Sequence, residues 1–350
     1  MTDPDPEGEA QRAAPVGPPG ATPTPARRGV LQQVAPWLIT IACFAYLYSR
    51  MRGPAAAQGM SVAAYLAHAF SGVDWGQWLL LMAPYSFFFF LVDSAVVCRV
   101  INWFNTRVRY VDILPVRGSS YILSIINEQV GKGAMGIYLY RRHRVPGWEL
   151  GSSMLFIMVC ELFYLTSWAV VGWTIAGDDL PPEFAAIPWV ALGVFGFYLL
   201  LNLFFSGAIP AGRALRERPV LSAFRKARWY HYPAIIALRS PAMIAAIFVY
   251  TFALGLFGVD VGVATMLGYL PVIFFGAATP GPMRSVAITL WVVLFPEQDP
   301  GRMGAFGLVQ HNFFIFFNAA IGLLFLGRAQ RELFAAPDPT AVDDATGEAP

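Results

Sequence analysis

The chain has 350 residues, of which 57% are hydrophobic and only 13% are charged. Soluble proteins carry about 25% charged residues, so this composition excludes a water-soluble globular domain. The net charge of +2 is too small for a nucleic-acid-binding protein. Uninterrupted apolar runs reach the roughly 20 residues that a helix needs to cross a bilayer. The sequence therefore predicts an all-α polytopic membrane protein.

The apolar runs, taken in chain order, predict six transmembrane helices. They cover residues 31–49, 78–101, 151–175, 187–208, 233–259 and 303–326. The first helix and a Gly- and Pro-containing connector make up residues 31–77. Residues 1–30 and 327–350 are poor in apolar residues and are predicted to be disordered tails. The N-terminal tail contains no apolar stretch, so a cleavable signal is not expected there.

Two further apolar segments are interrupted before they reach the length of a span. The first, at about 119–142, is broken by the glycine-rich stretch from Gly131 to Gly136. The second, at about 262–296, is broken by Thr-Pro-Gly-Pro at 279–282. Neither segment crosses a bilayer alone, so each is predicted to be a re-entrant helical hairpin.

The distribution of basic residues sets the expected orientation. Short basic loops stay in the cytoplasm, which places the loop at 209–232 inside and the acidic loop at 176–186 outside. Alternation then puts both termini in the cytoplasm and inserts the two hairpins from opposite faces. Residues 78–176 and 233–326 thus form an inverted repeat, joined by the span and basic loop at 177–232. This arrangement is typical of secondary transporters.

Polar residues near the hairpin breaks are candidate substrate contacts, because ionisable groups at membrane depth usually mark a substrate or ion path. Eleven helical residues from Ser119 rise about 16 Å, which places Asn127, Glu128 and Lys132 near the bilayer centre. A hairpin-stabilising ion pair is the alternative for the two charged residues. Arg284 is the counterpart beside the second break, and snorkelling to the outer interface is its alternative.

Two spans carry polar groups near their middle. Glu161 lies on a stripe with Tyr164 and Trp168, which favours either substrate binding or structural hydrogen bonding. In the last span a second stripe is predicted to face the bundle. It contains Gly304, Gly307, His311, Asn318 and Gly322. His311 is a candidate ligand contact, with close helix packing as the alternative.

Arginines near the cytoplasmic face suit phosphate groups. Arg141 and Arg142 end the first hairpin at the cytoplasmic face, where a guanidinium binds lipid phosphate or simply fixes topology. A basic loop before this hairpin is predicted to contain Arg107, Arg109 and Arg117. Arg239 begins a span just after a basic loop, and the sequence predicts that its side chain snorkels to the interface.

Motifs for catalysis and cofactor binding are missing from the sequence. The stretch from Gly131 to Gly136 matches G-x-G-x-x-G, but a dinucleotide site requires a βαβ unit around it. There is no H-E-x-x-H, G-x-S-x-G or Walker A motif, and no metal-spaced His or Cys cluster. Cys43, Cys98 and Cys160 lie in apolar runs and are interpreted as small hydrophobic residues. No cofactor or metal is expected, and no enzyme class is indicated.

Two blocks of sequence resemble the membrane domain of the lysylphosphatidylglycerol synthase and flippase superfamily, over about residues 70–326. The first is "YILSIINEQVGKGAMGIYLYRR", with an Asn, a glycine-rich break and Arg, followed by a span that carries Glu161. The second is "LPVIFFGAATPGPMRSVAI", with a Pro-Gly break followed by Arg284. The chain departs from the family where many members carry Pro-x-Arg-x-Gly-Glu at the first break. The synthetase domain of some relatives is not expected in 327–350.

The resemblance implies movement of a lipid or lipid-linked headgroup between leaflets of the bacterial inner membrane. We expect an anionic phospholipid or a polyprenyl phosphate, with its headgroup among Glu128, Lys132, Arg284 and Glu161. One alternative is a membrane-embedded enzyme acting on lipid-linked substrates, with Glu128 as base. A second is a scaffold subunit whose polar residues serve only packing, and a third is a fold like that of undecaprenyl phosphate transporters. A homo-oligomeric state stays open.

Overall fold

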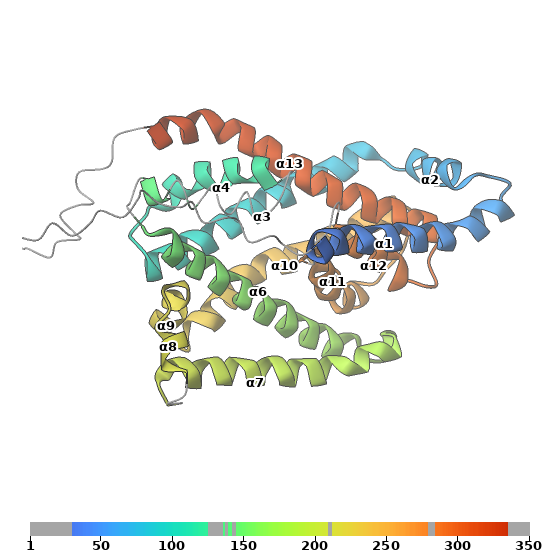
Figure 1. The fold of residues 1–350 in the computed structure, drawn as a ribbon. Coiled ribbons are helices and arrows are strands. Elements are labelled where there is room, and N and C mark those ends of the chain that lie inside the picture. The colour runs from blue at the N-terminus through green and yellow to red at the C-terminus, as the bar shows by residue number, and fades with distance from the viewer. Residues whose placement is uncertain are drawn as a thin grey trace, which may run out of the picture.

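Regular structure in the described part of the chain is entirely helical, which confirms the all-α prediction for these residues (Figure 1). The computed structural model describes residues 30–124, 136, 139–141, 145–208, 212–278 and 284–334. The longer helices are α1 (Val30–Ala57), α2 (Val62–Ser71), α3 (Trp75–Phe104), α4 (Tyr110–Ser124), α6 (Gly147–Ala176), α7 (Ile187–Ser206), α10 (His231–Leu256), α11 (Val263–Ala278), α12 (Ser285–Val293) and α13 (Pro300–Phe334). Short turns are η1 (Gly177–Asp179), η2 (Pro182–Ala186), α8 (Arg213–Arg216), η3 (Pro219–Leu221) and α9 (Ser222–Lys226).

Five helical segments in the described residues are long and apolar enough to cross a membrane. They are Trp75–Phe104, Gly147–Ala176, Pro182–Ser206, His231–Leu256 and Pro300–Gly327. Helix α1 covers the first predicted span but is not among these five, so the count of six spans stays a prediction. The last helix, α13, continues to Phe334 and thus runs past the predicted end of the final span.

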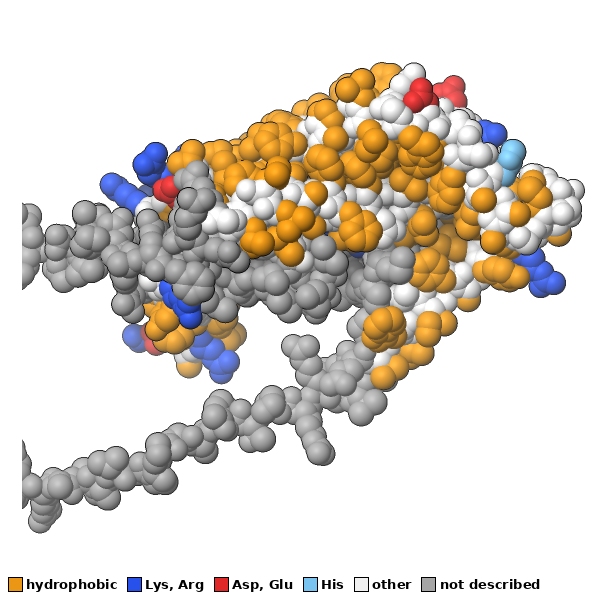
Figure 2. All heavy atoms as spheres, turned by 90° about the horizontal axis from the view of Figure 1, so that it is seen from above, with side chains coloured by type: hydrophobic (Ala, Val, Ile, Leu, Met, Phe, Trp, Pro, Cys, Tyr) orange, Lys and Arg blue, Asp and Glu red, His pale blue; other side chains and the backbone are white. Residues whose placement is uncertain are grey.

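The long helices pack along one another as an elongated bundle (Figure 1). Helix α3 packs against α10, α4 against α13, and α11 against α6. Helix α7 lies at the edge of the bundle against α6, and none of its residues is buried. Its Trp189 is 75% exposed. Figure 2 shows hydrophobic side chains covering the middle of one face, with charged side chains towards the two ends. An apolar belt of this kind suits a lipid environment.

Contacts between helix ends show at which end of the bundle α4 and α11 begin. The Trp103 and His231 rings lie 4.5 Å apart, so α3 ends where α10 begins and these two helices are antiparallel. Helix α4 follows the end of α3 and α11 follows the end of α10. Consequently, α4 and α11 begin at opposite ends of the bundle.

The chain that follows α3 and the chain that follows α10 each return to the end of the bundle at which they began. Near the start of α6, the Ser153 hydroxyl donates to Asn105 Oδ1 at 2.6 Å, just after the end of α3. Near the start of α13, Arg302 donates to the Gly258 carbonyl at 2.8 Å, just after the end of α10. The chain between α3 and α6, and the chain between α10 and α13, therefore each start and finish at one end.

Glycines permit the closest helix crossings. A Cβ atom on Gly172 of α6 would lie 2.5 Å from the Leu267 carbonyl oxygen and 2.7 Å from Gly268 Cα in α11. A Cβ atom on Gly322 of α13 would collide with the Gly118 carbonyl oxygen in α4. The interval along the chain from Gly118 to Gly268 equals that from Gly172 to Gly322. The two crossings thus occupy matching places in the two halves of the sequence.

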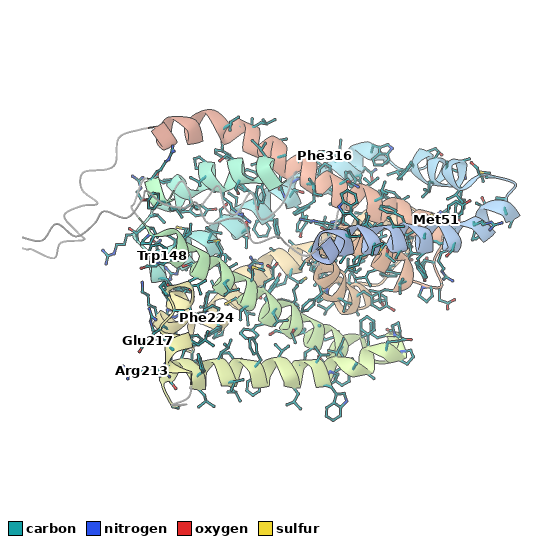
Figure 3. All side chains as sticks on the ribbon, viewed as in Figure 1. Met51, Trp148, Arg213, Glu217, Phe224 and Phe316 are labelled. Carbon is teal, nitrogen blue, oxygen red and sulfur yellow. The ribbon has the colours of Figure 1, made fainter. Side chains whose placement is uncertain are left out.

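The basic end of the bundle is formed by α8, α9 and the ends of α3, α6 and α7. Lys226 donates to the Phe104 carbonyl at 2.7 Å and pairs with Glu149 at 3.4 Å. Arg213 and Glu217 form an exposed ion pair at this end (Figure 3). The hydrogen bond and positive charge of Arg213 lower the pKa of the Glu217 carboxyl group. These exposed contacts fix local geometry more than global stability.

One boundary prediction in the first half is wrong. Helix α4 begins at Tyr110, well before the predicted start of the hairpin at Ser119, and it contains Pro115 and Arg117. Arg117 was expected in a basic loop, but it lies on a helix and points into the bundle, where Asp93 neutralises it. The glycine-rich break at 131–136 (apart from Gly136) and the Thr-Pro-Gly-Pro break lie outside the described residues. Of the predicted tails at 1–30 and 327–350, residues 1–29 and 335–350 also lie outside them. Residues 327–334 are helical as the end of α13, so the predicted start of the C-terminal tail is wrong.

Candidate functional site

A cluster of charged side chains is buried where α3, α4, α6 and α10 meet. Its centre is Asp93 of α3, whose side chain is 7% exposed. Arg117 Nε donates to Asp93 Oδ2 at 2.6 Å, and the Tyr121 hydroxyl donates to the same oxygen at 2.8 Å. Arg239 Nη2 approaches the other carboxylate oxygen, Oδ1, at 3.5 Å. Asp93 is thus held by three partners from two other helices.

Arg239 of α10 connects this centre to Glu161 of α6. Its Nη1 lies 3.1 Å from Glu161 Oε1, and its side chain is 10% exposed. The Tyr164 hydroxyl donates to the Arg239 backbone carbonyl at 3.4 Å, and the guanidinium lies 6.0 Å from the Tyr164 ring centre. The buried Nε of Arg239 has no hydrogen-bond partner among the described residues. Arg239 therefore retains a hydrogen-bond donor that the described protein does not use.

Local sequence explains why Asp93 faces inward. On α3, the buried residues Ser86, Phe90, Asp93 and Val97 recur at intervals of three and four, so they share one helical face. This face packs on α10, which presents Arg239. Among the described residues, the two carboxylates and two guanidinium groups of the cluster balance in formal charge. Burial of isolated charges is very costly, so this pairing is what makes the cluster compatible with an apolar bundle.

The prediction that Arg239 snorkels to the interface is wrong. Its side chain is buried and paired with two carboxylates from α3 and α6. An arginine near the end of a span reaches water only if its side chain points outward. Here the buried face of α10 carries Ile235, Arg239, Ala242 and Ala246, which directs the guanidinium into the bundle.

A second polar group lies in the other half of the molecule, between α10, α12 and α13. Trp291 Nε1 donates to His311 Nε2 at 3.3 Å, so the imidazole proton resides on Nδ1. Gln310 Nε2 donates to the Tyr250 hydroxyl at 2.5 Å. His311 and Gln310 are both 2% exposed. Arg284 interacts electrostatically with His311 and Tyr250 and adopts a left-handed backbone conformation, with φ of 48°.

Buried tyrosines lie between the two polar groups. The side chains of Tyr85 and Tyr250 are hydrogen-bonded, and their ring centres are 5.4 Å apart. Tyr85 also interacts electrostatically with Tyr164, the neighbour of Arg239. Hydroxyl groups thus extend from the charge cluster towards Gln310. His311 Nδ1 and Gln310 Oε1 are buried without a partner in the described part of the chain, which suits a site that admits water or a polar ligand.

The described residues of the predicted site have different partners. Glu161 pairs with Arg239, whereas Arg284 interacts electrostatically with His311 and Tyr250. Arg141 is exposed and contributes to neither group. The remaining predicted site residues, Asn127, Glu128, Lys132 and Arg142, lie outside the described residues.

The predicted inward stripe on α13 is confirmed. His311 and Asn318 are 2% and 5% exposed. A Cβ atom on Gly307 would lie 2.8 Å from Trp291 Cδ1, and Gly304 and Gly322 are equally enclosed by Met51 and Gly118. The stripe therefore packs on α12, α1 and α4, as its composition indicated.

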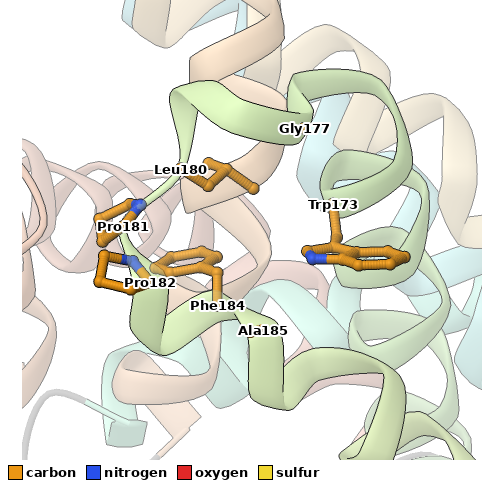
Figure 4. A pocket seen from close by; sticks show the side chains of 7 residues that line it. All are labelled: Trp173, Gly177, Leu180, Pro181, Pro182, Phe184 and Ala185. Atoms are coloured by element: carbon orange, nitrogen blue, oxygen red, sulfur yellow. The ribbon is translucent and has the colours of Figure 1, made fainter.

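The rest of the described structure contains weaker candidates for a functional site. The described residues contain no group of three His, Cys, Asp or Glu side chains that could hold a metal ion. A hollow of about 300 Å³ lies between the end of α6 and the start of α7. Its walls include Trp173, Leu180 and Phe184 (Figure 4). No titratable side chain lines this hollow, so the charge cluster is the stronger candidate site.

No family model matches the chain, and neither the curated proteins nor the solved structures searched contain a significant match.

The sequence analysis missed three members of the cluster: Asp93, Arg117 and Arg239. Asp93 carried a usable signal, because a carboxylate deep within an apolar span requires a partner. The local sequence around its partners, Arg117 and Arg239, does not indicate that they pair with Asp93. Arg117 and Arg239 lie 24 and 146 residues away along the chain, and each stands near a basic loop that offers a simpler interpretation.

Proposed function

We propose that this protein is an integral membrane lipid transporter that moves an anionic phospholipid or lipid-linked headgroup between leaflets by alternating access. The observation that carries the proposal is Arg239, a buried guanidinium with an unused donor, set among apolar helices and paired with a partly exposed carboxylate. Arginine suits phosphate because its planar fork forms paired hydrogen bonds with two oxygens. Ionisable groups at this depth usually serve a substrate or ion path.

The arrangement of the helices supports an inverted repeat of residues 78–176 and 233–326. Helices α4 and α11 start at opposite ends of the bundle. The glycines at the α4–α13 and α6–α11 crossings are related by the same separation along the chain, from Gly118 to Gly268 and from Gly172 to Gly322. The same interval relates Glu161 to His311. Broken segments of opposite orientation that meet near the midplane are the typical setting of a transport site. On this proposal both interrupted segments are re-entrant hairpins and α1 is a sixth span.

The proposed substrate is defined by its charge. Its phosphate would bind Arg239 while the acyl chains remain in the lipid beside the bundle. Basic side chains at the α8 and α9 end would attract anionic headgroups from the cytoplasmic leaflet, as a basic surface does at a membrane. The protein would thus lie in the bacterial inner membrane with both termini in the cytoplasm.

Reconstitution provides the test. The purified protein is placed in liposomes that carry trace fluorescent phosphatidylglycerol or fluorescent phosphatidylcholine, and leaflet exchange is followed with a membrane-impermeant quencher. We expect faster exchange of phosphatidylglycerol, its loss in Arg239→Gln and partial retention in Arg239→Lys. Arg52→Gln is the matched control, because Arg52 is an exposed arginine on α1, away from the cluster.

Two results would contradict the proposal. One is an unchanged exchange rate in Arg239→Gln that elutes as a folded, monodisperse protein. The other is an absence of exchange for every headgroup tested, polyprenyl phosphate included, which would favour a scaffold. The appearance of a chemically altered lipid would favour a membrane-embedded enzyme instead.

A further inference from the structure

Glu161 is the least constrained member of the charge cluster. Its carboxylate makes one ion-pair contact in the described structure, to Arg239 at 3.1 Å, and its side chain is 39% exposed. Asp93 makes three contacts and is 7% exposed. An incoming anion therefore meets Glu161 first, and it competes with Glu161 rather than with Asp93 for the guanidinium.

We propose that Glu161 is a displaceable counter-ion: a headgroup with one negative charge replaces its carboxylate on Arg239, and Glu161 takes up one proton. This inference rests on the proposed function and adds the coupling ion to it. The chemistry is a single protonation, in which a carboxylate and a proton give a carboxylic acid. The proton comes from the aqueous phase on the side to which the site opens during the proposed transport.

Charge balance is the physical reason for this coupling. A bound anion alone would add one negative charge inside an apolar bundle, where uncompensated charge is very costly. Protonation of Glu161 removes one negative charge and so restores the charge of the empty cluster. The anion and the proton therefore favour each other's binding.

The groups that surround Glu161 favour it, rather than another carboxylate, as the displaceable counter-ion. Arg239 from α10 is its partner, and Asp93 reaches the same guanidinium from α3. On its own helix, Cys160 and Tyr164 are the neighbouring titratable side chains. The other transmembrane neighbours of α6, helices α7 and α11, contain no charged residue. The bases of α9 lie near Glu149, about 18 Å along α6 from Glu161.

Coupling of one proton to one headgroup has a quantitative consequence. A difference of one pH unit across the membrane shifts the equilibrium distribution of the anionic lipid between leaflets about tenfold. Because one anion and one proton move together, the exchange is electroneutral. A membrane potential imposed with potassium and valinomycin therefore leaves the distribution unchanged.

Liposomes that contain phosphatidylglycerol and hold a stable pH gradient test this coupling. Wild-type protein should redistribute the fluorescent lipid about tenfold per pH unit, whereas Glu161→Gln should still exchange it but give an even distribution at every gradient. Glu149→Gln is the matched control, because Glu149 lies on the same helix and pairs only at the surface. If Glu161→Gln keeps the wild-type response to the gradient, the coupling is refuted while lipid transport stands.

A second measurement does not depend on transport. Infrared difference spectra are recorded in nanodiscs as phosphatidylcholine is replaced by phosphatidylglycerol at neutral pH. The inference predicts a new absorption of a protonated carboxylic acid, absent in Glu161→Gln and present in Glu149→Gln. If the band is missing in wild-type protein that exchanges phosphatidylglycerol, the coupling is wrong. If the band appears without exchange, the counter-ion role holds and the transport proposal fails.

Discussion

Substitution of Asp93 should be far more damaging than substitution of Glu161, although both carboxylates pair with Arg239. Asp93→Asn removes the buried carboxylate that Arg117 and Arg239 share. Loss of one partner from a buried ion pair costs about 3 to 5 kcal/mol, because the remaining charge stays uncompensated. Glu161 makes a single ion-pair contact and is 39% exposed, so Glu161→Gln should cost less, about 1 kcal/mol.

Reversible unfolding in mixed micelles of sodium dodecyl sulfate and a mild detergent measures both free energies. The double variant Asp93→Leu with Arg117→Met serves as an internal check, because removal of both partners leaves no orphaned charge from this pair. It should be more stable than Asp93→Asn despite carrying two changes. Equal losses for Asp93→Asn and Glu161→Gln, or a double variant weaker than both, would refute the assignment of Asp93 as the structural centre.

Two further predictions concern other parts of the fold. Gly172→Ala and Gly322→Ala should each lower the free energy of unfolding by about 1 to 3 kcal/mol through backbone collision, whereas Gly193→Ala, which meets open space, should be neutral or slightly stabilising in the same assay. Tyr65 donates to Asp299 at 2.6 Å, and burial together with that carboxylate raises the pKa of the phenol to about 12. Because the unfolded value is about 10, the resulting stabilisation is complete below pH 10 and is lost as the pH approaches 12. The thermal midpoint of Tyr65→Phe should start lower, by the equivalent of about 1 kcal/mol, and fall less than that of wild type over this range.

The sequence predicts the helices well because the lipid environment leaves the backbone few choices. An apolar run that crosses a bilayer must satisfy its own hydrogen bonds, so α3, α6, α7, α10 and α13 lie on the runs from which they were predicted, although α7 and α10 end two and three residues early. The start of α4 was predicted too late. Pro115 and two nearby arginines resemble a loop, and helical structure there depends on packing against α13, which no local pattern reveals.

The charge cluster could be predicted only in part, for a related reason. Glu161 stood out because it interrupts an apolar run near its middle. Arg239 stands nine residues into α10, where an interfacial position and an interior position are equally compatible with its place in the sequence. Only the rotation of α10 against α3 decides between them. That rotation is set by contacts 146 residues apart, and a single sequence carries no record of such contacts.

Arg239 also connects the two halves of the proposed repeat, so its contacts would change if the halves moved relative to each other. Asp93, Arg117, Tyr121 and Glu161 all belong to the first half of the proposed repeat, and Arg239 alone comes from the second. Within its own half Asp93 contacts Arg117 at 2.6 Å and Tyr121 at 2.8 Å, and its contact with Arg239 is the longest of the three. A shift of α10 would therefore break the Arg239 contacts without exposing an unpaired Asp93. On the proposed mechanism, an anion bound to Arg239 would travel with α10, away from Glu161, and movement of the halves would coincide with exchange of the counter-ion.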